Sequence, residues 1–237
     1  MMAVSREYGR GLLIVLALLG TVAHATEVRA TEVRATEEGE CQPGEQALKT
    51  RLATLRTLSA NFEQRVTAAD GHELQTSAGL IQLAKPGHIY WVAEPPFEQT
   101  VVADGTRIWI YDPDLAQVTV KSLRHQLDNS PAALLVGDSD RLLEEFRVCA
   151  VPETDSPGVQ KPEANRMRIV LRPLATDAVY TRIELVFAGT EPRTIIMTDS
   201  LGQSTDIQLR DVELNQPVDP MLFRFMPPPG VDVFQDD

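Results

Sequence analysis

After the first third of the chain, apolar and polar residues alternate, which is typical of strands with one buried face. Ile89, Trp91 and Ala93 share one side of such a strand, whereas Tyr90 and Val92 share the other. Successive side chains of a strand point to opposite faces of a sheet. We therefore expect a strand here whose Ile89 and Trp91 face an apolar interior.

Short turn signals connect the expected strands. Asp104-Gly105 separates 101–103 from 108–111, and Asp112-Pro113-Asp114 precedes 118–120. An Asp-Gly pair between two β-rich runs is a strong signal for a hairpin. Similar runs recur in the C-terminal third, so we expect about ten strands in an antiparallel meander.

Three segments have helical spacing instead. The first has apolar residues three or four positions apart, at Leu48, Leu52, Leu55, Leu58, Phe62 and Val66. This spacing predicts an amphipathic helix of about five turns. A second helix is expected in 129–137, which offers Ser130 as N-cap, Pro131 at the first helical position and a closing Gly137. A third short helix follows Asp138. The sequence thus predicts one mainly β domain with about three α-helices.

The N-terminal region is expected to lie outside this domain. Residues 1–25 have a basic start, a short apolar run and the ending Ala23-His24-Ala25, which are typical of a secretory signal peptide. The apolar run is shorter than the roughly 20 residues that cross a bilayer. Residues 26–44 repeat the unit ATEVR with neither helical nor strand period, which favours a disordered spacer. Residues 45–237 are expected to form the folded domain.

The chain is acidic, with 22 basic and 34 acidic residues and a net charge of −12. Without Arg6, Arg10 and Glu7 of the expected signal peptide, 20 basic and 33 acidic residues leave a net charge of −13. Proteins that bind nucleic acid or anionic lipid surfaces need clusters of Lys and Arg. We therefore expect neither partner, and interpret the charge as a solubilising surface.

Only two cysteines occur, Cys41 and Cys149. An oxidising compartment favours a disulfide between them, although two unpaired thiols remain the alternative. The bridge would close a loop of more than a hundred residues, worth roughly 4 to 5 kcal/mol in the chain-entropy description. Their spacing excludes a catalytic Cys-x-x-Cys pair.

No catalytic motif is evident. His72, His88 and His125 lack the spacing and the cysteine neighbours of a zinc site. The chain contains neither a nucleophile elbow nor a phosphate-binding glycine loop nor a calcium loop. A chance carboxylate pair in a cleft stays open, but a charged surface explains the carboxylates. We expect a protein that is not an enzyme and needs no cofactor or metal.

A curved sheet with only three helices points to a binding function. Three helices cover a concave sheet less completely than a second sheet would, and the interior of a larger barrel becomes a ligand cavity. The residues expected to line this cavity are Leu55, Phe62, Ile89, Trp91, Leu134 and Leu135. For each of them, ordinary core packing is the alternative.

From about Leu48 to Val233 the chain resembles the LolA family, the periplasmic carriers of outer-membrane lipoproteins. The similar stretches read LSANFEQRV, GLIQLAKPGHIYWV, VVADGTRIWIYDPDLAQVTV, NSPAALL, TDSLGQSTDIQL and FRFMPPPGVDV. The resemblance implies an incomplete, strongly curved antiparallel β-barrel covered by about three α-helices around an apolar cavity.

The resemblance also implies a function. Family members are periplasmic carriers, and we expect a monomer here. They accept acylated lipoproteins from an ATP-driven inner-membrane complex and deliver them to an outer-membrane acceptor. A specialised carrier or sensor of the same fold, binding another lipid or a glycolipid, is the alternative. A lipid-cleaving enzyme of this fold would need a nucleophile motif that the chain lacks.

One residue role follows from the resemblance. The family has an arginine that hydrogen-bonds the backbone of the helical lid and holds the empty form shut, and this chain has Lys85 at that position. Lysine keeps the charge and the donors but loses the planar fork of arginine. Lys85 is therefore expected to latch the lid, with a solvated lysine at the strand end as the alternative.

Overall fold

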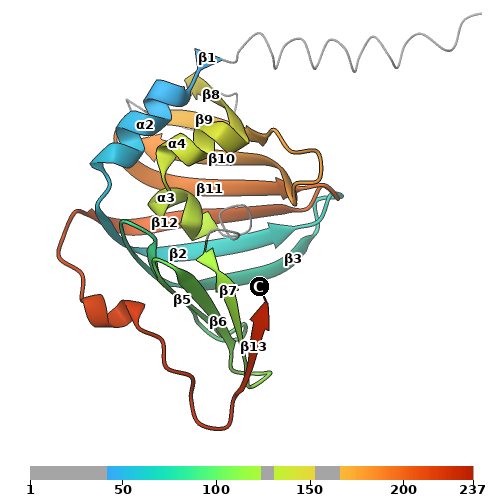
Figure 1. Cartoon of the computed structure of the whole chain (residues 1–237). Helices are drawn as coiled ribbons and strands as arrows, with labels where there is room; N and C mark the ends of the chain where they lie inside the picture. Colours follow the sequence, from blue (N-terminus) through green and yellow to red (C-terminus); the bar gives the residue numbers. More distant parts are fainter. Residues whose placement is uncertain (1–41, 124–130, 153–165, 237) are drawn as a thin grey trace, which may run out of the picture. The chain divides into compact units, whose positions relative to one another are not determined.

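The computed structural model describes residues 42–123, 131–152 and 166–236 (Figure 1). The strands are β1 (Gln42–Pro43), β2 (Thr57–Thr67), β3 (Glu73–Ala84), β4 (His88–Ala93), β5 (Gln99–Asp104), β6 (Arg107–Asp112), β7 (Gln117–Ser122), β8 (Phe146–Pro152), β9 (Arg166–Pro173), β10 (Tyr180–Ala188), β11 (Glu191–Asp199), β12 (Ser204–Leu214) and β13 (Asp232–Asp236). The helices are α2 (Glu45–Thr54), α3 (Pro131–Val136), α4 (Ser139–Glu145) and the 3₁₀ helix η2 (Pro220–Phe223). Within these ranges, every helix falls short of the length and hydropathy needed to cross a membrane.

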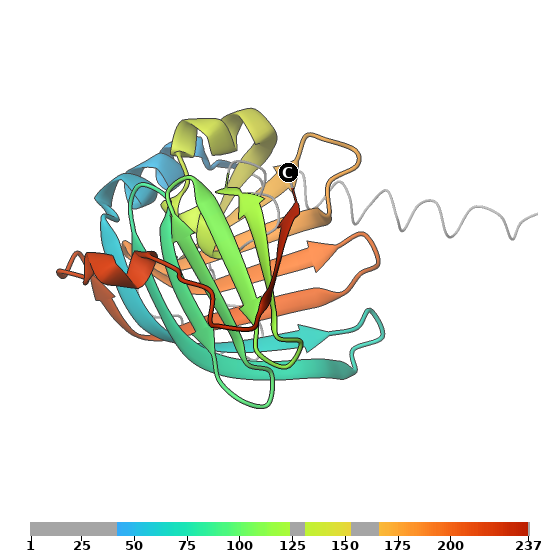
Figure 2. The same ribbon diagram turned by 60° about the horizontal axis from the view of Figure 1, so that its bottom comes forward.

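All thirteen strands belong to one sheet, in the order β1-β8-β9-β10-β11-β12-β2-β3-β4-β5-β6-β7-β13. Two meanders, β2–β7 and β8–β12, join through the long antiparallel pairing of β12 with β2. The only parallel neighbours among the described strands are β13 and β7. The sheet curls without closing, and its concave face holds α2, α3 and α4 (Figures 1 and 2). The expected fold class, a mainly β and incomplete antiparallel barrel with about three α-helices, is confirmed.

The expected five-turn helix is wrong beyond Thr54. α2 ends there, and Thr57 already begins β2. Asn215 stabilises the break, because its side chain accepts a hydrogen bond from the Arg56 amide (2.8 Å) and donates one to the Thr54 carbonyl (3.0 Å). Leu58 and Phe62 lie four positions apart, which suits one face of a strand as well as one face of a helix. The pairing of β2 with both β3 and β12 decides in favour of the strand.

The two short helices form where the sequence predicted them. The Gly137 amide donates to the Ala133 carbonyl (2.8 Å) and closes α3. Asp138 caps α4, because its side chain accepts from the Asp140 amide (2.9 Å). The predicted N-cap Ser130 lies outside the described residues, as do the signal peptide and most of the spacer. The last spacer residues, 42–44, form β1 and its link to α2.

The helices cover the concave face through apolar contacts. Leu48 and Leu52 of α2 and Leu134 and Leu135 of α3 are fully buried in one core cluster. The same cluster contains the inward-facing residues of the strands, among them Ile81, Leu83, Ile89, Ile195 and Ile207. Burial of apolar surface, at roughly 25 cal/mol per Å², therefore holds the helices on this wall.

The C-terminal segment covers the opposite, convex face of β4–β6. Phe223 of η2 packs on His88, with ring centroids 5.2 Å apart. Phe225 lies 6.3 Å from the ring centroid of Trp109 and 6.1 Å from that of Tyr111. β13 then adds to the edge of the sheet beside β7. Aromatic side chains on this face therefore already have partners within the chain.

Cys149 of β8 takes part in a disulfide. β1 pairs with β8, and Pro43 lies opposite Cys149, so the chain just after Cys41 runs along the strand that carries Cys149. Cys41 itself lies outside the described residues, so the Cys41–Cys149 bridge stays a prediction.

We expect a peptide map of the unreduced protein to contain one peptide pair that joins these residues. Two separately alkylated peptides would contradict the bridge.

Gly79 generates a prediction about the fold. A Cβ atom at this position would lie 1.9 Å from the Val92 carbonyl oxygen and 3.0 Å from the Phe62 ring. We expect Gly79→Ala to lower the free energy of unfolding by roughly 1–3 kcal/mol, because β3 and β4 would have to separate. Denaturant unfolding measures the change. The control Ala78→Ser adds one heavy atom to the exposed neighbour and should shift stability by less than about 0.5 kcal/mol. Equal effects of both variants would contradict this account.

Candidate functional site

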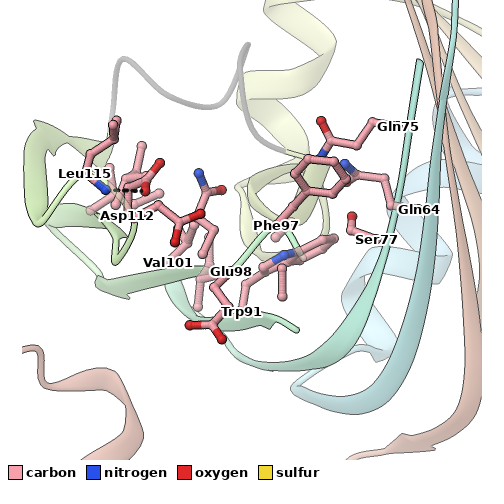
Figure 3. Close-up of a pocket in the computed structure, with 16 residues that line it drawn as sticks. Gln64, Gln75, Ser77, Trp91, Phe97, Glu98, Val101, Asp112 and Leu115 are labelled. Atoms are coloured by element: carbon pink, nitrogen blue, oxygen red, sulfur yellow. Dashed lines mark hydrogen bonds between the residues drawn. The ribbon is translucent and has the colours of Figure 1, made fainter. Parts of the chain in front are cut away.

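A cavity of about 540 Å³ lies on the concave face beside α3 (Figure 3). Its volume is within the roughly 300–1,000 Å³ of typical ligand sites. We call it the concave cavity. The residues that line it are Gln64, Gln75, Ser77, Ile89, Trp91, Ala93, Phe97, Glu98, Gln99, Val101, Ile108, Ile110, Asp112, Asp114, Leu115 and Ala132.

The floor of the concave cavity is apolar because three neighbouring strands place alternate residues on it. Trp91 of β4 lies opposite Val101 of β5, which lies opposite Ile110 of β6. Ile89 and Ile108 belong to the next row towards the core, with Ala103 between them. A floor of this kind is formed mainly by apolar side-chain atoms and favours apolar ligands.

Trp91 joins the cavity to the core. Its side chain is 9 % exposed and packs on Phe62, with ring centroids 3.9 Å apart and planes 31° apart. Phe62 lies opposite Gly79, and Gly79 lies opposite Ala93, so the missing side chain of Gly79 leaves room for the Phe62 ring. Phe62 thus supports Trp91 from behind and does not line the cavity itself.

The six expected lining residues divide into two groups. Ile89 and Trp91 line the concave cavity. Leu55, Phe62, Leu134 and Leu135 do not line it and are buried in the core cluster, where the helices meet the sheet. A ligand reaches the inner wall beneath α3 only where these helix contacts open.

Sequence reasoning missed the mouth of the cavity. Phe97 and Leu115 are 47 % and 68 % exposed and project from the loops after β4 and β6. Figure 3 shows the Phe97 ring between Trp91 and the side chains of Gln64 and Gln75. Phe97 follows the Glu-Pro-Pro run, where alternation ends. No periodic signal therefore marked it as a lining residue.

Lys85 connects the sheet to α2. Its Nζ donates to the Leu52 carbonyl oxygen (2.8 Å) in the last turn of α2, and its amide donates to the Arg56 carbonyl (2.8 Å). A cation at a helix C-terminus interacts favourably with the helix dipole and the free carbonyls.

Burial lowers the pKa of Lys85 below its usual 10.5, and the nearby Asp138 carboxylate opposes this shift. The charged ammonium therefore costs folding free energy at any pH below the lowered pKa. This cost disappears as the pH rises through that pKa towards 10.5. The amine still has hydrogen-bond donors when it is neutral, so the contact with α2 does not require the charge.

A second cavity of about 450 Å³ lies at the other side of the helices. It is bounded by the end of α4 and the β9–β10 hairpin, with Leu174, Val179 and Tyr180 among its lining residues. Burial raises the pKa of the Tyr180 hydroxyl. In the part of the chain that the structure describes, no three His, Cys, Asp or Glu side chains are grouped so that they could hold a metal ion.

Comparison with known proteins places this site in a family context. The model of the family "Outer membrane lipoprotein carrier protein LolA" matches residues 53–226. A relative from Hahella chejuensis, described as an outer-membrane lipoprotein carrier protein, is 36% identical over 193 residues, covering 81% of this chain and 88% of the relative. A relative with the same description from Nitrosospira multiformis is 37% identical over 194 residues, covering 81% and 89%.

Two solved structures are similar to this chain at low sequence identity. An uncharacterised conserved protein from Thermus thermophilus superposes with a TM-score of 0.50 at 12% identity, covering 81% of this chain and 98% of that one. A LolA superfamily protein from Nitrosomonas europaea gives a TM-score of 0.44 at 14% identity, covering 76% and 97%.

The two tryptophans of the chain allow a direct test of ligand entry. Trp91 lines the concave cavity, whereas Trp109 packs on Phe225 at the convex face. In the Trp109→Phe variant, a fatty acid brominated along its chain should quench the fluorescence of Trp91, because bromine quenches only on contact. In the matched Trp91→Phe variant, Trp109 should keep its emission. Equal quenching of both tryptophans would show that the ligand does not select the concave cavity.

Proposed function

The chain belongs to the family of outer-membrane lipoprotein carrier proteins, and from this premise we propose that it carries acylated lipoproteins through the periplasm. In this proposal an ATP-driven complex of the inner membrane loads the carrier, and an acceptor at the outer membrane unloads it. The protein needs no catalytic group, cofactor or metal for this task. The observation that carries the proposal is the apolar floor of the concave cavity, where Trp91, Val101 and Ile110 are available to an acyl chain.

The energetics of acyl chains favour a carrier that shields its cargo only partly. Burial of a methylene group is worth ~0.8 kcal/mol, so three long chains prefer a membrane by roughly 30 kcal/mol. The free energy of non-covalent binding does not exceed about 18 to 21 kcal/mol. The carrier therefore cannot extract its cargo alone, and energy must enter at the donor. Transfer to an acceptor with better burial then proceeds downhill.

The helices are the cover of the binding wall. α2, α3 and α4 occupy the concave face, and α3 contributes Ala132 to the lining of the cavity. Lys49 of α2 forms an ion pair with Asp140 of α4 (2.6 Å), which links two parts of the cover. We propose that acyl chains enter at the concave cavity and displace these helices from the inner wall. Leu55, Phe62, Leu134 and Leu135 would then become contacts of the cargo.

Lys85 acts as the latch of this cover in the proposal. Its hydrogen bond to Leu52 is its one direct side-chain contact with α2 among the described hydrogen bonds. Such a bond to a charged donor contributes about 1.5–3 kcal/mol. The lid must open during every loading cycle, and a single bond of this strength suits a contact that is repeatedly broken.

Replacement of Lys85 tests the latch. Lys85→Met keeps the side chain up to the ε position but removes the donor, and we expect roughly tenfold faster uptake of an apolar fluorescent probe. Lys85→Arg should restore slow uptake, because arginine also donates to carbonyl oxygens. Lys49→Met is the matched control on the cover. Its ion pair is exposed and worth about 0–1 kcal/mol, so uptake should change far less. Unchanged uptake in Lys85→Met would assign Lys85 an ordinary structural role.

Depletion of the protein from its cells tests the function. We expect outer-membrane lipoproteins to accumulate in the inner-membrane fraction, because the periplasm offers an acylated protein no other apolar environment. The purified protein should also co-isolate with acylated lipoproteins. Complementation with the wild-type gene provides the control. Normal sorting of lipoproteins after depletion would favour the alternative, a specialised carrier or sensor of another lipid or glycolipid.

A further inference from the structure

We propose that the carboxylates at the mouth of the concave cavity make it selective for acyl groups whose glycerol end carries no negative charge. Anionic phospholipids would thereby be excluded. This inference rests on the proposed function, since it names the class of lipid that the same cavity accepts. It concerns Glu98, Asp112 and Asp114, which we call the mouth carboxylates.

The mouth carboxylates come from two loops that flank the apolar floor. Glu98 lies between β4 and β5, Asp112 ends β6, and Asp114 lies in the turn before β7. Figure 3 shows Asp112 across the cavity from Gln64 and Gln75. A ligand whose chains lie on the floor therefore has these carboxylates on one side of its polar end and the amides of Gln64 and Gln75 on the other.

No basic side chain neutralises this mouth among the described residues. The described lining residues include three carboxylates and neither Lys nor Arg. Asp112 accepts a hydrogen bond from the Leu115 amide (3.1 Å), which holds the turn but leaves the charge in place. Lys121 lies opposite Ile108 in β7, and it does not line the cavity.

The charge at the mouth separates two kinds of lipid that share the same chains. The lipid end of a triacylated lipoprotein is an N-acylated cysteine with a thioether-linked diacylglyceryl group, which has no ionised group. A phosphatidylglycerol presents a phosphate monoanion at the same place. Glu98 and Asp114 are exposed and Asp112 is half-buried, so their repulsion of a phosphate acts partly through water and is screened by salt. The net charge of the chain, −12, acts in the same direction.

Such repulsion would keep abundant phospholipids from competing with the scarcer lipoproteins for the cavity. A carrier that is loaded at a membrane meets far more phospholipid than lipoprotein, and both offer acyl chains to an apolar floor. Affinity for the chains alone cannot distinguish them. Specificity then requires an element that disfavours the competitor, and the mouth carboxylates supply it.

The test compares two brominated probes with identical acyl chains, a diacylglycerol and a phosphatidylglycerol, each in micelles of a neutral detergent. Quenching of Trp91 in the mature Trp109→Phe protein reports binding. We expect the phosphatidylglycerol to bind about tenfold more weakly at low salt. The ratio should shrink between about 0.01 M and 1 M salt, as the Debye length falls from roughly 30 to 3 Å. A purely structural role of these residues would give no salt dependence.

Variants assign the discrimination to the mouth. Glu98→Gln/Asp112→Asn/Asp114→Asn should bring the ratio of the two dissociation constants close to one. The control Glu45→Gln/Glu144→Gln/Glu213→Gln removes three exposed carboxylates elsewhere and should keep the ratio. If the mouth variant does not fold, Glu98→Gln/Asp114→Asn leaves the turn bond of Asp112 intact and should still lower the ratio.

The outcomes separate the inference from the proposed function. Equal binding of both probes by the wild-type cavity would overturn the selectivity and leave the carrier function standing. An unchanged ratio in the mouth variants would also overturn it. If neither probe quenches Trp91, the cavity does not take acyl chains, and the proposed function fails together with the inference.

Discussion

The inner wall of the curved sheet is apolar and is stable only when it is shielded from water. The arrangement of the helices and of the cavity depends on this requirement. Ile81, Leu83 and Ile89 are fully buried in the core cluster that also contains the apolar side chains of α2 and α3. Where the helices end, the same wall continues as the apolar floor of the concave cavity. Helix side chains and acyl chains can both bury the apolar surface of the wall, since each removes this surface from water. In the proposed function, the protein's own cover and its cargo therefore compete for one surface.

The rest of the fold leaves only the concave face of the sheet for this competition. The C-terminal segment already covers the convex face, where Phe225 packs near Trp109 and Tyr111. Long pairing of β12 with β2 holds the two meanders together. Short helices, by contrast, are fixed by few directional contacts, among them the hydrogen bond from Lys85 and the Lys49–Asp140 ion pair. A sheet with long strand pairings and a cover with few directional contacts suits the loading and unloading that we propose.

Much of the fold could be predicted from the sequence, because alternation encodes which side of a strand is buried. Alternation predicts that Ile89 and Trp91 share one buried face. The spacing wrongly predicts a helix at Phe62, because a spacing of four fits both periods and only the pairing of β2 with its neighbours decides between them. The mouth was not predictable. Glu98 lies in the loop before β5 and Asp112 ends β6, and only the folded sheet brings both to one cavity.

If acyl chains replace the helices on the inner wall, as we propose, loading must move the cover away from the sheet. Spin labels at Glu144 on α4 and Ala78 on β3, both exposed, report the separation of cover and sheet. On loading with a triacylated lipoprotein, the account predicts a longer distance between the labels and a return to the initial value after release. A distance that stays the same in the loaded protein would show that the cover does not move, and would contradict the account.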